Sequence, residues 1–392
     1  MKNKFKYDLC IVGGLGRVGL PLGILFANKG LKVCLNDINT KHAELVKKGI
    51  MPFKDKGAQP LLKKTINKKK LDISLNYKCI SDSKCIIITL GTDLDKKGNP
   101  EIKNFLKIIN IIKKSLTKSQ TIIVRSSVYP GTCEKILKII KNRNIAYCPE
   151  RIKQGYSIKE LKKLPQIVSG FSKNAIDNAS TLFKKISPKI IYSTISEAEL
   201  IKFFTNAWRY IQFATVNEFF MICQNLNIDF EKIRKMMIDN YPRTKNMPKA
   251  GFAAGPCLYK DTAQLNTFFK NNFFLGNSAI KINEGLPNYI VKKISLKYNL
   301  KNKIVGILGM AFKANIDDSR NSLSYKLRKV LKSHGSNVIC SDEYIKDKNF
   351  ISKEKLIKIS DIIIIGAPHN IYKKINFKKK ILFNIWDHNK NY

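Results

Sequence analysis

Residues 7–30 read YDLCIVGGLGRVGLPLGILFANKG, and this stretch decides the fold of the first part of the chain. Its apolar, β-branched start (7–12) predicts a buried strand, and the glycines that follow lead into an apolar helical segment closed by Gly30. The next apolar run, LKVCLND, predicts a second strand that ends in Asp37. Strand, turn, helix and strand in this order form the first unit of a doubly wound parallel sheet.

The glycine spacing in this turn predicts a dinucleotide site. Gly14 permits the tight turn, Gly16 lets the backbone approach a pyrophosphate, and Gly19 allows close packing of helix on strand. The helix N-terminus then faces the anion. Asp37, about 20 residues further on, can accept hydrogen bonds from ribose hydroxyls and would repel a 2′-phosphate, which favours NAD over NADP. The alternative is a glycine-rich tight turn in another kind of α/β protein. The remaining candidate cofactor contacts in the turn are Leu15, Arg17 and Val18.

The rest of the chain predicts three regions. Further strands are expected at 84–90, 120–127, 144–150 and 165–170, and the alternation continues to about residue 193. Residues 197–225 contain no Gly or Pro and carry apolar residues at helical spacing, which predicts one long, largely buried helix. Strand patterns return at 303–312, 336–343, 360–368 and 381–387. We therefore expect an α/β chain with two Rossmann-like doubly wound parallel-sheet domains, 1–196 and 301–392, bridged by the long helix and a helical connector, 197–300.

Composition limits the classes of function. The formal charge is +43, but the excess is mostly Lys, spread along the chain with much Ile and Asn, and a genome rich in A/T codons gives the same pattern. No nucleic-acid-binding motif accompanies the charge, so we expect no nucleic-acid partner, although the field should attract a small anionic substrate. The nine cysteines are scattered and show no metal-ligand spacing. Reduced thiols, no signal segment and no membrane span predict a cytoplasmic protein without a metal.

Two loops carry candidate reactive groups. The stretch GFAAGPCLYKDT (251–262) surrounds Cys257 with small residues and follows it with Lys260 and Asp261. A reactive thiolate needs such an open loop and a nearby positive charge, whereas a buried structural cysteine needs neither. The loop FKANIDDSRNS (312–322) follows a predicted strand and offers Lys313 and Arg320 to a phosphate or a sugar hydroxyl. The alternative for this second loop is an ordinary solvated turn.

Seven motifs in order resemble the UDP-glucose/GDP-mannose dehydrogenase family over nearly the whole chain. They are GGLGRVGLPLG (13–23), GTD (91–93), RSSVYPGT (125–132), CPERIKQG (148–155), AELIKFFTNAWR (198–209), GFAAGPCLYKD (251–261) and LGMAFKANIDDSRNS (308–322). The resemblance implies an NAD-dependent dehydrogenase that oxidises the C6 alcohol of a UDP-sugar to a carboxylate in two hydride transfers. It also implies a homodimer built on the helical connector.

The resemblance assigns the catalytic roles. Cys257 matches the nucleophile that forms a thiohemiacetal and then a thioester, and Asp261 matches the group that orients or activates water. Lys202 and Asn206 match a pair that steadies the developing oxyanion, and their i, i+4 spacing puts both on one helix face. Glu150 matches the carboxylate that assists water and proton transfer.

The resemblance also assigns ligand contacts. Thr92 and Ser127 fall at the cofactor site, and Ser127, which replaces the family's threonine, is also a candidate catalytic residue. Residues expected near the substrate, in addition to Glu150, Lys202 and Asn206, are Arg151, Gly255, Lys260, Lys313, Arg320 and, from a partner subunit, Arg243.

The hexose stays open between UDP-glucose and a UDP-N-acetyl-mannosamine or -glucosamine, and Arg151 after Glu150 is more typical of the N-acetylhexosamine branch. One rival is a single-step NAD-dependent hydroxyacid dehydrogenase, which needs neither the thiol nor a second nucleotide-type domain. A second rival is a basic protein that binds anionic polymers without catalysis. His334 and His369 look unpaired, so we expect no histidine-based relay.

Overall fold

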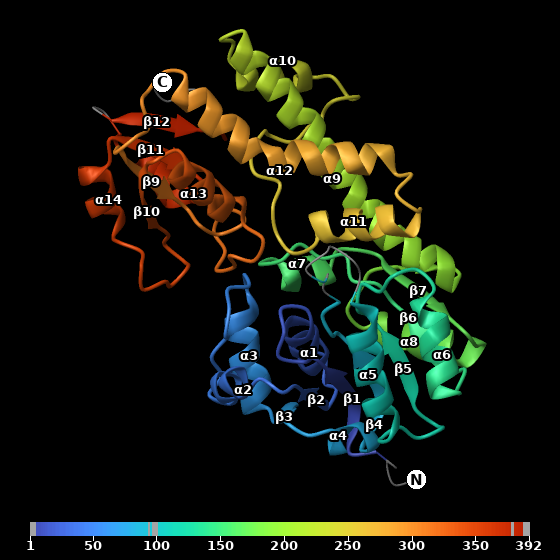
Figure 1. The fold of residues 1–392 in the computed structure, drawn as a ribbon. Helices are drawn as coiled ribbons and strands as arrows, with labels where there is room; N and C mark the ends of the chain where they lie inside the picture. Colours follow the sequence, from blue (N-terminus) through green and yellow to red (C-terminus); the bar gives the residue numbers. More distant parts are fainter. Residues whose placement is uncertain (1–4, 93–94, 96–100, 378–379, 387–392) are drawn as a thin grey trace. The chain divides into compact units, whose positions relative to one another are not determined.

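A computed structural model of the chain describes residues 5–92, 95, 101–377 and 380–386. The chain divides into two compact units, Met1–Phe204 and Thr205–Tyr392. In Figure 1 the first runs from blue to green and the second from yellow-green to red. Two residues of the motifs quoted above, Asp93 and Asp387, lie outside the described residues.

The first unit is built on an eight-stranded sheet in the order β3-β2-β1-β4-β5-β6-β7-β8. Its strands are β1 (Tyr7–Val12), β2 (Val33–Asn36), β3 (Leu71–Ser74), β4 (Ser83–Ile88), β5 (Thr121–Val124), β6 (Ile145–Tyr147), β7 (Gln166–Gly170) and β8 (Ile190–Tyr192). The strand order changes direction between the adjacent strands β1 and β4. From β1 the chain adds strands toward one edge of the sheet, and from β4 it adds them toward the other. In doubly wound folds a ligand binds at the carboxyl ends of the strands at this reversal.

Both faces of this sheet are buried, as the unbroken apolar strands predict. Successive residues of β1 point to opposite sides: Leu9 and Ile11 belong to one hydrophobic cluster, and Cys10 and Val12 belong to another. The helices of the unit are α1 (Gly19–Asn28), α2 (Thr40–Lys47), α3 (Ala58–Asn67), α4 (Lys78–Ser81), α5 (Ile102–Lys113), α6 (Thr132–Ile140), α7 (Ser157–Leu161) and α8 (Lys173–Phe183).

One strand pairing departs from the parallel pattern. Every pairing in this sheet is parallel among the described residues except β6 with β7, which is antiparallel. An antiparallel neighbour starts at the edge where the previous strand ends, so the connection at 148–165 stays at the carboxyl edge instead of crossing the sheet. This topology leaves the CPER motif at the edge that binds ligands.

The second unit combines helices with a four-stranded parallel sheet in the order β10-β9-β11-β12. Its strands are β9 (Ile304–Leu308), β10 (Asn337–Ser341), β11 (Ile362–Ile365) and β12 (Ile381–Asn384). Helix α9 (Ile195–Asn225) starts in the first unit and continues into the second. The other helices are α10 (Phe230–Ile238), α11 (Leu258–Phe268), α12 (Phe274–Ser295), α13 (Leu323–Ser333), α14 (Lys353–Ile359) and the 3₁₀ helix η1 (Asn370–Lys374). The predicted α/β chain with two Rossmann-like domains and one long helix is thus confirmed.

A buried aspartate joins the loops at the carboxyl edge of the second sheet. Asp342, which follows β10, accepts backbone N–H bonds from Met310 and Ala311 on one oxygen and from Tyr344 and Ile345 on the other. The expectation that His369 is unpaired is wrong, because its Nε2 lies 3.1 Å from Asp342 Oδ2. The backbone N–H of Asn315 donates to His369 Nδ1 at 2.8 Å, so Nε2 carries the ring proton and donates to the carboxylate. Because β10 and β11 both pair in parallel with β9, the ends of these two strands bring the distant residues together.

We predict that Asp342→Ala lowers the free energy of unfolding by about 3–5 kcal/mol, because it leaves buried N–H groups without an acceptor. Burial opposes ionisation of Asp342, but the bond from His369 and the backbone N–H bonds outweigh it and hold its pKa below the ordinary value. The stabilisation is therefore complete above the ordinary pKa of about 3.9 and is lost as the pH falls through the folded-state pKa. Urea unfolding at several pH values measures it, with exposed Glu354→Ala as control. Equal stability of the two variants at neutral pH would contradict the prediction.

Candidate active site

The backbone of the glycine turn after β1 lies very close to neighbouring backbone atoms. A Cβ on Gly14 would lie 2.6 Å from the carbonyl oxygen of Ile11, and one on Gly19 would lie 2.5 Å from that of Gly13, so neither position admits a side chain. A Cβ on Gly16 would meet only the Gly13 carbonyl oxygen, at 3.3 Å. Gly14 and Gly19 thus hold the turn against the strand and helix, while Gly16 leaves the outer side open for a pyrophosphate at the N-terminus of α1.

Asp37 is tied to the same turn. Its Oδ2 accepts the backbone N–H of Leu15 at 2.9 Å, and its Oδ1 accepts that of Asn39 at 3.0 Å. Each carboxylate oxygen keeps a further lone pair for a ribose hydroxyl. The neighbouring Ile38 is an apolar side chain that is 82% exposed.

Two threonine hydroxyl groups in the segment after β4 also lie at this edge. Thr92 donates a hydrogen bond to the carbonyl oxygen of Ser127 at 2.5 Å, so the structure brings these two predicted residues together. Thr89, which the prediction missed, lies with its hydroxyl 2.9 Å from the carbonyl oxygen of Val12 and 3.0 Å from that of Gly13. Thr89 therefore links the end of β4 to the glycine turn.

Glu150 lies in a buried ion pair rather than in an open position. Arg125, which is 1% exposed, donates from Nε to Glu150 Oε2 at 2.8 Å and also from Nη2 to the same oxygen. The other oxygen accepts the backbone N–H groups of Arg151 and Ile152 at 2.7 and 2.9 Å. Arg151 itself donates to the carbonyl oxygen of Pro165 at 2.6 Å, and desolvation lowers its pKa. Sequence reasoning quoted Arg125 in a motif but gave it no role.

Cys257 differs from every other cysteine in the chain. It is exposed, whereas the other eight are buried. Burial raises the pKa of the Cys85 and Cys148 thiols to about 12, so both stay protonated near neutral pH. Cys257 precedes the first residue of α11, and the N-terminal end of a helix dipole favours a negative charge. The structure thus leaves one thiol accessible to a substrate.

Helices α9 and α11 bring two other predicted residues together. Asn206 donates from Nδ2 to Asp261 Oδ2 at 2.5 Å, and both side chains are buried. Lys260 Nζ lies 3.7 Å from the other oxygen of Asp261. Lys202 is buried one turn before Asn206 on α9. The expectation that the long helix is largely buried is wrong at Phe204 and Trp208, which are 54% and 62% exposed.

The cysteine loop also lies against the predicted nucleotide-sugar loop. Gly255 has φ +106°, and a Cβ there would lie 2.6 Å from the ring of Phe312. Its backbone N–H donates to the carbonyl oxygen of Asn321 at 3.3 Å. Two motifs that are about 60 residues apart in the sequence therefore meet within the second unit.

The remaining predicted cations make local contacts. Lys313 Nζ lies 5.6 Å from the centre of the Phe312 ring. Arg320 forms a fork with Asp318, with Nε 3.0 Å from Oδ1 and Nη2 2.7 Å from Oδ2. Exposed Arg243 donates to the hydroxyl of Tyr241 at 2.8 Å.

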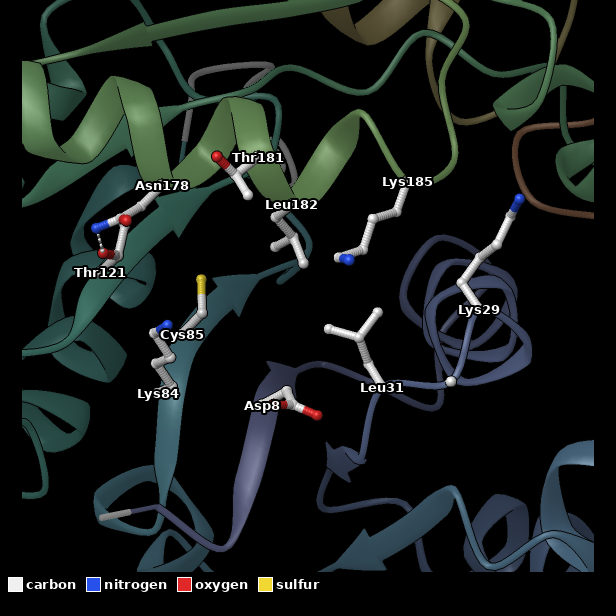
Figure 2. A pocket seen from close by; sticks show the side chains of 11 residues that line it. Asp8, Lys29, Leu31, Lys84, Cys85, Thr121, Asn178, Thr181, Leu182 and Lys185 are labelled. Atoms are coloured by element: carbon white, nitrogen blue, oxygen red, sulfur yellow. Dashed lines mark hydrogen bonds between the residues drawn. The ribbon is translucent and has the colours of Figure 1, made fainter. Parts of the chain in front are cut away.

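Two cavities lie in separate units. One of about 330 Å³, near the carboxyl ends of β11 and β12, is lined in part by Lys249, His369, Asn384 and Trp386. The other, of about 390 Å³, lies at the opposite, amino-terminal edge of the first sheet. Figure 2 shows Asp8, Lys84, Cys85, Lys185 and other lining residues. Because the glycine turn lies at the carboxyl edge, this second cavity is not the dinucleotide site.

Among the described residues, no group of His, Cys, Asp or Glu side chains could hold a metal ion. No described helix combines the length and apolar character that a membrane crossing requires.

A dinucleotide cradle on one Rossmann unit, an exposed thiol and a second nucleotide-type sheet define an NAD-dependent dehydrogenase. Family models agree: the NAD-binding, central and UDP-binding domains of the UDP-glucose/GDP-mannose dehydrogenase family match residues 8–187, 196–285 and 306–387. The chain belongs to this family and is an NAD-dependent UDP-sugar oxidoreductase.

Relatives span nearly the whole chain. A UDP-N-acetyl-D-mannosamine dehydrogenase of Methanococcus vannielii is 30% identical over 97% of this chain and 89% of its own length. A UDP-glucose 6-dehydrogenase of Rickettsia conorii is 26% identical over 93% of this chain and 90% of its own. The solved structure of a UDP-D-ManNAc dehydrogenase from Pyrococcus horikoshii has a TM-score of 0.88 at 24% identity, covering 96% of this chain and 98% of the other. That structural likeness supports the fold.

We predict that Gly16→Ala weakens NAD binding by at least about tenfold, or about 1.4 kcal/mol, while the melting temperature stays nearly unchanged. The new methyl group meets only the Gly13 carbonyl oxygen, at 3.3 Å, but it occupies the side from which a pyrophosphate approaches. Calorimetric titration with NAD measures the affinity. Gly285→Ala is a matched control, because a Cβ there meets no atom within 4 Å and the residue lies in α12 of the other unit. Unchanged NAD affinity in Gly16→Ala would show that the glycine turn is not part of the cofactor site.

Proposed function

We propose that the chain oxidises the C6 alcohol of a UDP-hexose to the carboxylate with Cys257 as the covalent nucleophile. The observation that carries this proposal is the accessible thiol at the N-terminus of α11, next to a buried Asn206–Asp261 hydrogen bond. A thiol is needed because an aldehyde lacks the tetrahedral C–H bond from which the second hydride must leave. A single-step alcohol dehydrogenase would need no such group.

The chemistry balances in four steps. The alcohol loses a hydride and a proton and becomes the aldehyde. The Cys257 thiolate adds to the aldehyde carbon, and the oxygen takes a proton to give the thiohemiacetal. Loss of a second hydride and a proton gives the thioester, and water then cleaves the C–S bond to release the carboxylate and return the thiol. Bound NAD supplies the acceptor for each hydride, so two are consumed per sugar.

Side chains on α9 and α11 support these steps. We assign Lys202 and Asn206 to the negative charge that develops on the substrate oxygen, since a buried donor stabilises such charge strongly. Asp261 and its neighbour Lys260 would orient the hydrolytic water. Both oxygens of Glu150 already accept hydrogen bonds, which supports a role in positioning the 150–152 segment. Proton transfer by Glu150 requires that one of these bonds open.

The first unit has the residues that NAD needs. Gly14, Gly16 and Gly19 leave room for the pyrophosphate, and Asp37 offers lone pairs to the ribose. We assign exposed Ile38 to one face of the adenine. Functional boundaries follow as 1–196 for the cofactor, 197–300 for the catalytic connector and 301–392 for the nucleotide sugar.

We propose UDP-N-acetylmannosamine as the substrate, with UDP-glucose as the alternative. Six relatives named UDP-N-acetyl-D-mannosamine dehydrogenase are 26–30% identical to this chain, and two named UDP-glucose 6-dehydrogenase are 25–26% identical. Within the second unit, Lys313 and Arg320 lie on the loop against the cysteine segment and suit the diphosphate.

We also propose that the enzyme is a cytoplasmic homodimer. Exposed apolar residues lie along α9 and at the junction of α11 and α12, a combination that usually marks an interface. They are Phe204, Trp208, Phe219, Ile222, Phe268, Phe269, Phe274 and Leu275. The partner's Arg243 would reach the sugar from this interface.

We predict two NADH per molecule of limiting UDP-N-acetylmannosamine, and at most one with Cys257→Ser, whose weaker nucleophile cannot form the thioester. Absorbance at completion measures the stoichiometry, and UDP-glucose and UDP-N-acetylglucosamine are assayed in parallel. Cys223→Ser serves as a control because Cys223 is buried. One NADH per sugar with the unmodified enzyme would refute the four-electron reaction, and turnover of UDP-glucose alone would refute the choice of hexose.

We predict that Trp208→Glu converts the dimer into monomers, because a carboxylate in the apolar contact cannot be desolvated cheaply. Light scattering coupled to size exclusion measures the mass. The control is Tyr192→Glu, which changes a similarly exposed aromatic residue on β8. A monomeric unmodified enzyme, or a dimeric Trp208→Glu variant, would place the interface elsewhere or exclude it.

A further inference from the structure

Asn217 of α9 holds the start of the cysteine loop by its backbone. The backbone N–H of Gly251 donates to Asn217 Oδ1 at 2.9 Å, and Asn217 Nδ2 donates to the carbonyl oxygen of Gly251 at 3.1 Å. The side-chain amide therefore pairs with one residue as a neighbouring strand would. Asn217 is 0% exposed, so this pairing is shielded from water.

A second buried asparagine fixes the first. Asn217 Nδ2 also donates to Asn283 Oδ1 at 2.9 Å, and Asn283 Nδ2 donates to the carbonyl oxygen of Tyr210 on α9 at 3.0 Å. Asn283 lies on α12 and is 0% exposed. The bonds set the orientation of both amides, because each oxygen accepts and each nitrogen donates. Only one arrangement satisfies all four bonds.

Gly251 offers only its backbone groups for hydrogen bonding to the rest of the unit. Its φ is +140°, and a Cβ there would lie 2.2 Å from the indole ring of Trp386. A side chain is therefore excluded, and only the backbone groups remain available for anchoring. Buried backbone groups that lose their partners cost about 1–3 kcal/mol each, so the loop has little alternative to the Asn217 pairing.

The two anchor points of the cysteine segment lie on one face of α9. Asn206 and Asn217 are separated by about three turns, at 3.6 residues per turn, and so point the same way. Asn217 holds Gly251, which precedes Cys257, and Asn206 holds Asp261, which follows it. Cys257 thus lies on a segment that is hydrogen-bonded to the same helix on both sides of the thiol.

We propose that Asn217, supported by Asn283, is a positioning residue that keeps the Cys257 thiol within reach of the aldehyde. This inference rests on the proposed role of Cys257. Hydride loss from the alcohol does not involve the thiol, whereas addition to the aldehyde needs close and aligned atoms. A displacement of about 1 Å can slow such a step about 100-fold. Releasing the upstream anchor should therefore spare the first oxidation and impair the second.

The test uses Asn217→Ala and Asn283→Ala in the full-length enzyme, with Asn144→Ala as matched control. Asn144 is also buried and donates two hydrogen bonds, but to Gln120 and Thr121 in the first unit. NADH per limiting sugar is measured, and released aldehyde is trapped with a hydroxylamine reagent. We expect both variants to fall from two NADH toward one and to release aldehyde, while Asn144→Ala and the unmodified enzyme release none.

Each outcome decides the inference. Two NADH per sugar and no trapped aldehyde in the Asn217 and Asn283 variants would overturn it, as would an equal loss of both oxidations. Failure of both variants to fold would assign the pair to stability alone and would also overturn it. Failure of the proposed function is recognised separately, because the unmodified enzyme or Cys257→Ser would then already show the wrong stoichiometry.

Discussion

Buried amides of helix α9 hold the cysteine segment by hydrogen bonds, and the same helix leaves several apolar side chains exposed. Lys202, Asn206 and Asn217 are buried, whereas Trp208 and Ile222 are exposed. A buried amide must find hydrogen-bond partners, and those of α9 find them in the segment around Cys257. An exposed apolar face gains free energy when it is covered, which suits a second copy of the chain. In the proposed homodimer, one helix therefore connects the subunit interface to the position of Cys257.

The few carboxylates of this basic chain occupy positions that organise loops. The sequence has 29 acidic residues against 72 basic ones, so acidic side chains are scarce. Asp37, Glu150, Glu199 and Asp342 each accept at least two backbone N–H bonds. Such charge-assisted bonds are stronger than neutral ones and fix the backbone where strands end. The surplus positive charge stays on the surface, where it can attract an anionic nucleotide sugar but does not shape the fold.

Local patterns predicted what depends on neighbours in the sequence. The glycine turn, Asp37, the long helix and the second βαβ start all follow from spacing and periodicity, and the structure contains each of them. Contacts between distant segments were not predictable in this way. The antiparallel β6–β7 pair, the Arg125–Glu150 ion pair and the Asp342–His369 pair depend on which strands become neighbours. The exposure of Phe204 and Trp208 was also missed, because an apolar residue has the same pattern whether it faces a core or a partner.

The sequence by itself determined the cofactor cradle, the class of chemistry and the identity of the candidate nucleophile. The cradle depends on residue types at fixed local spacing, which backbone geometry translates directly into a turn. The class of chemistry and the candidate nucleophile follow from the motifs that resemble the family. Only the tertiary structure decided that Cys257 is exposed among buried cysteines and that its segment is anchored by Asn206 and Asn217. Burial and hydrogen-bond partnership are properties of packing between segments far apart in the chain, so no short window of sequence contains them.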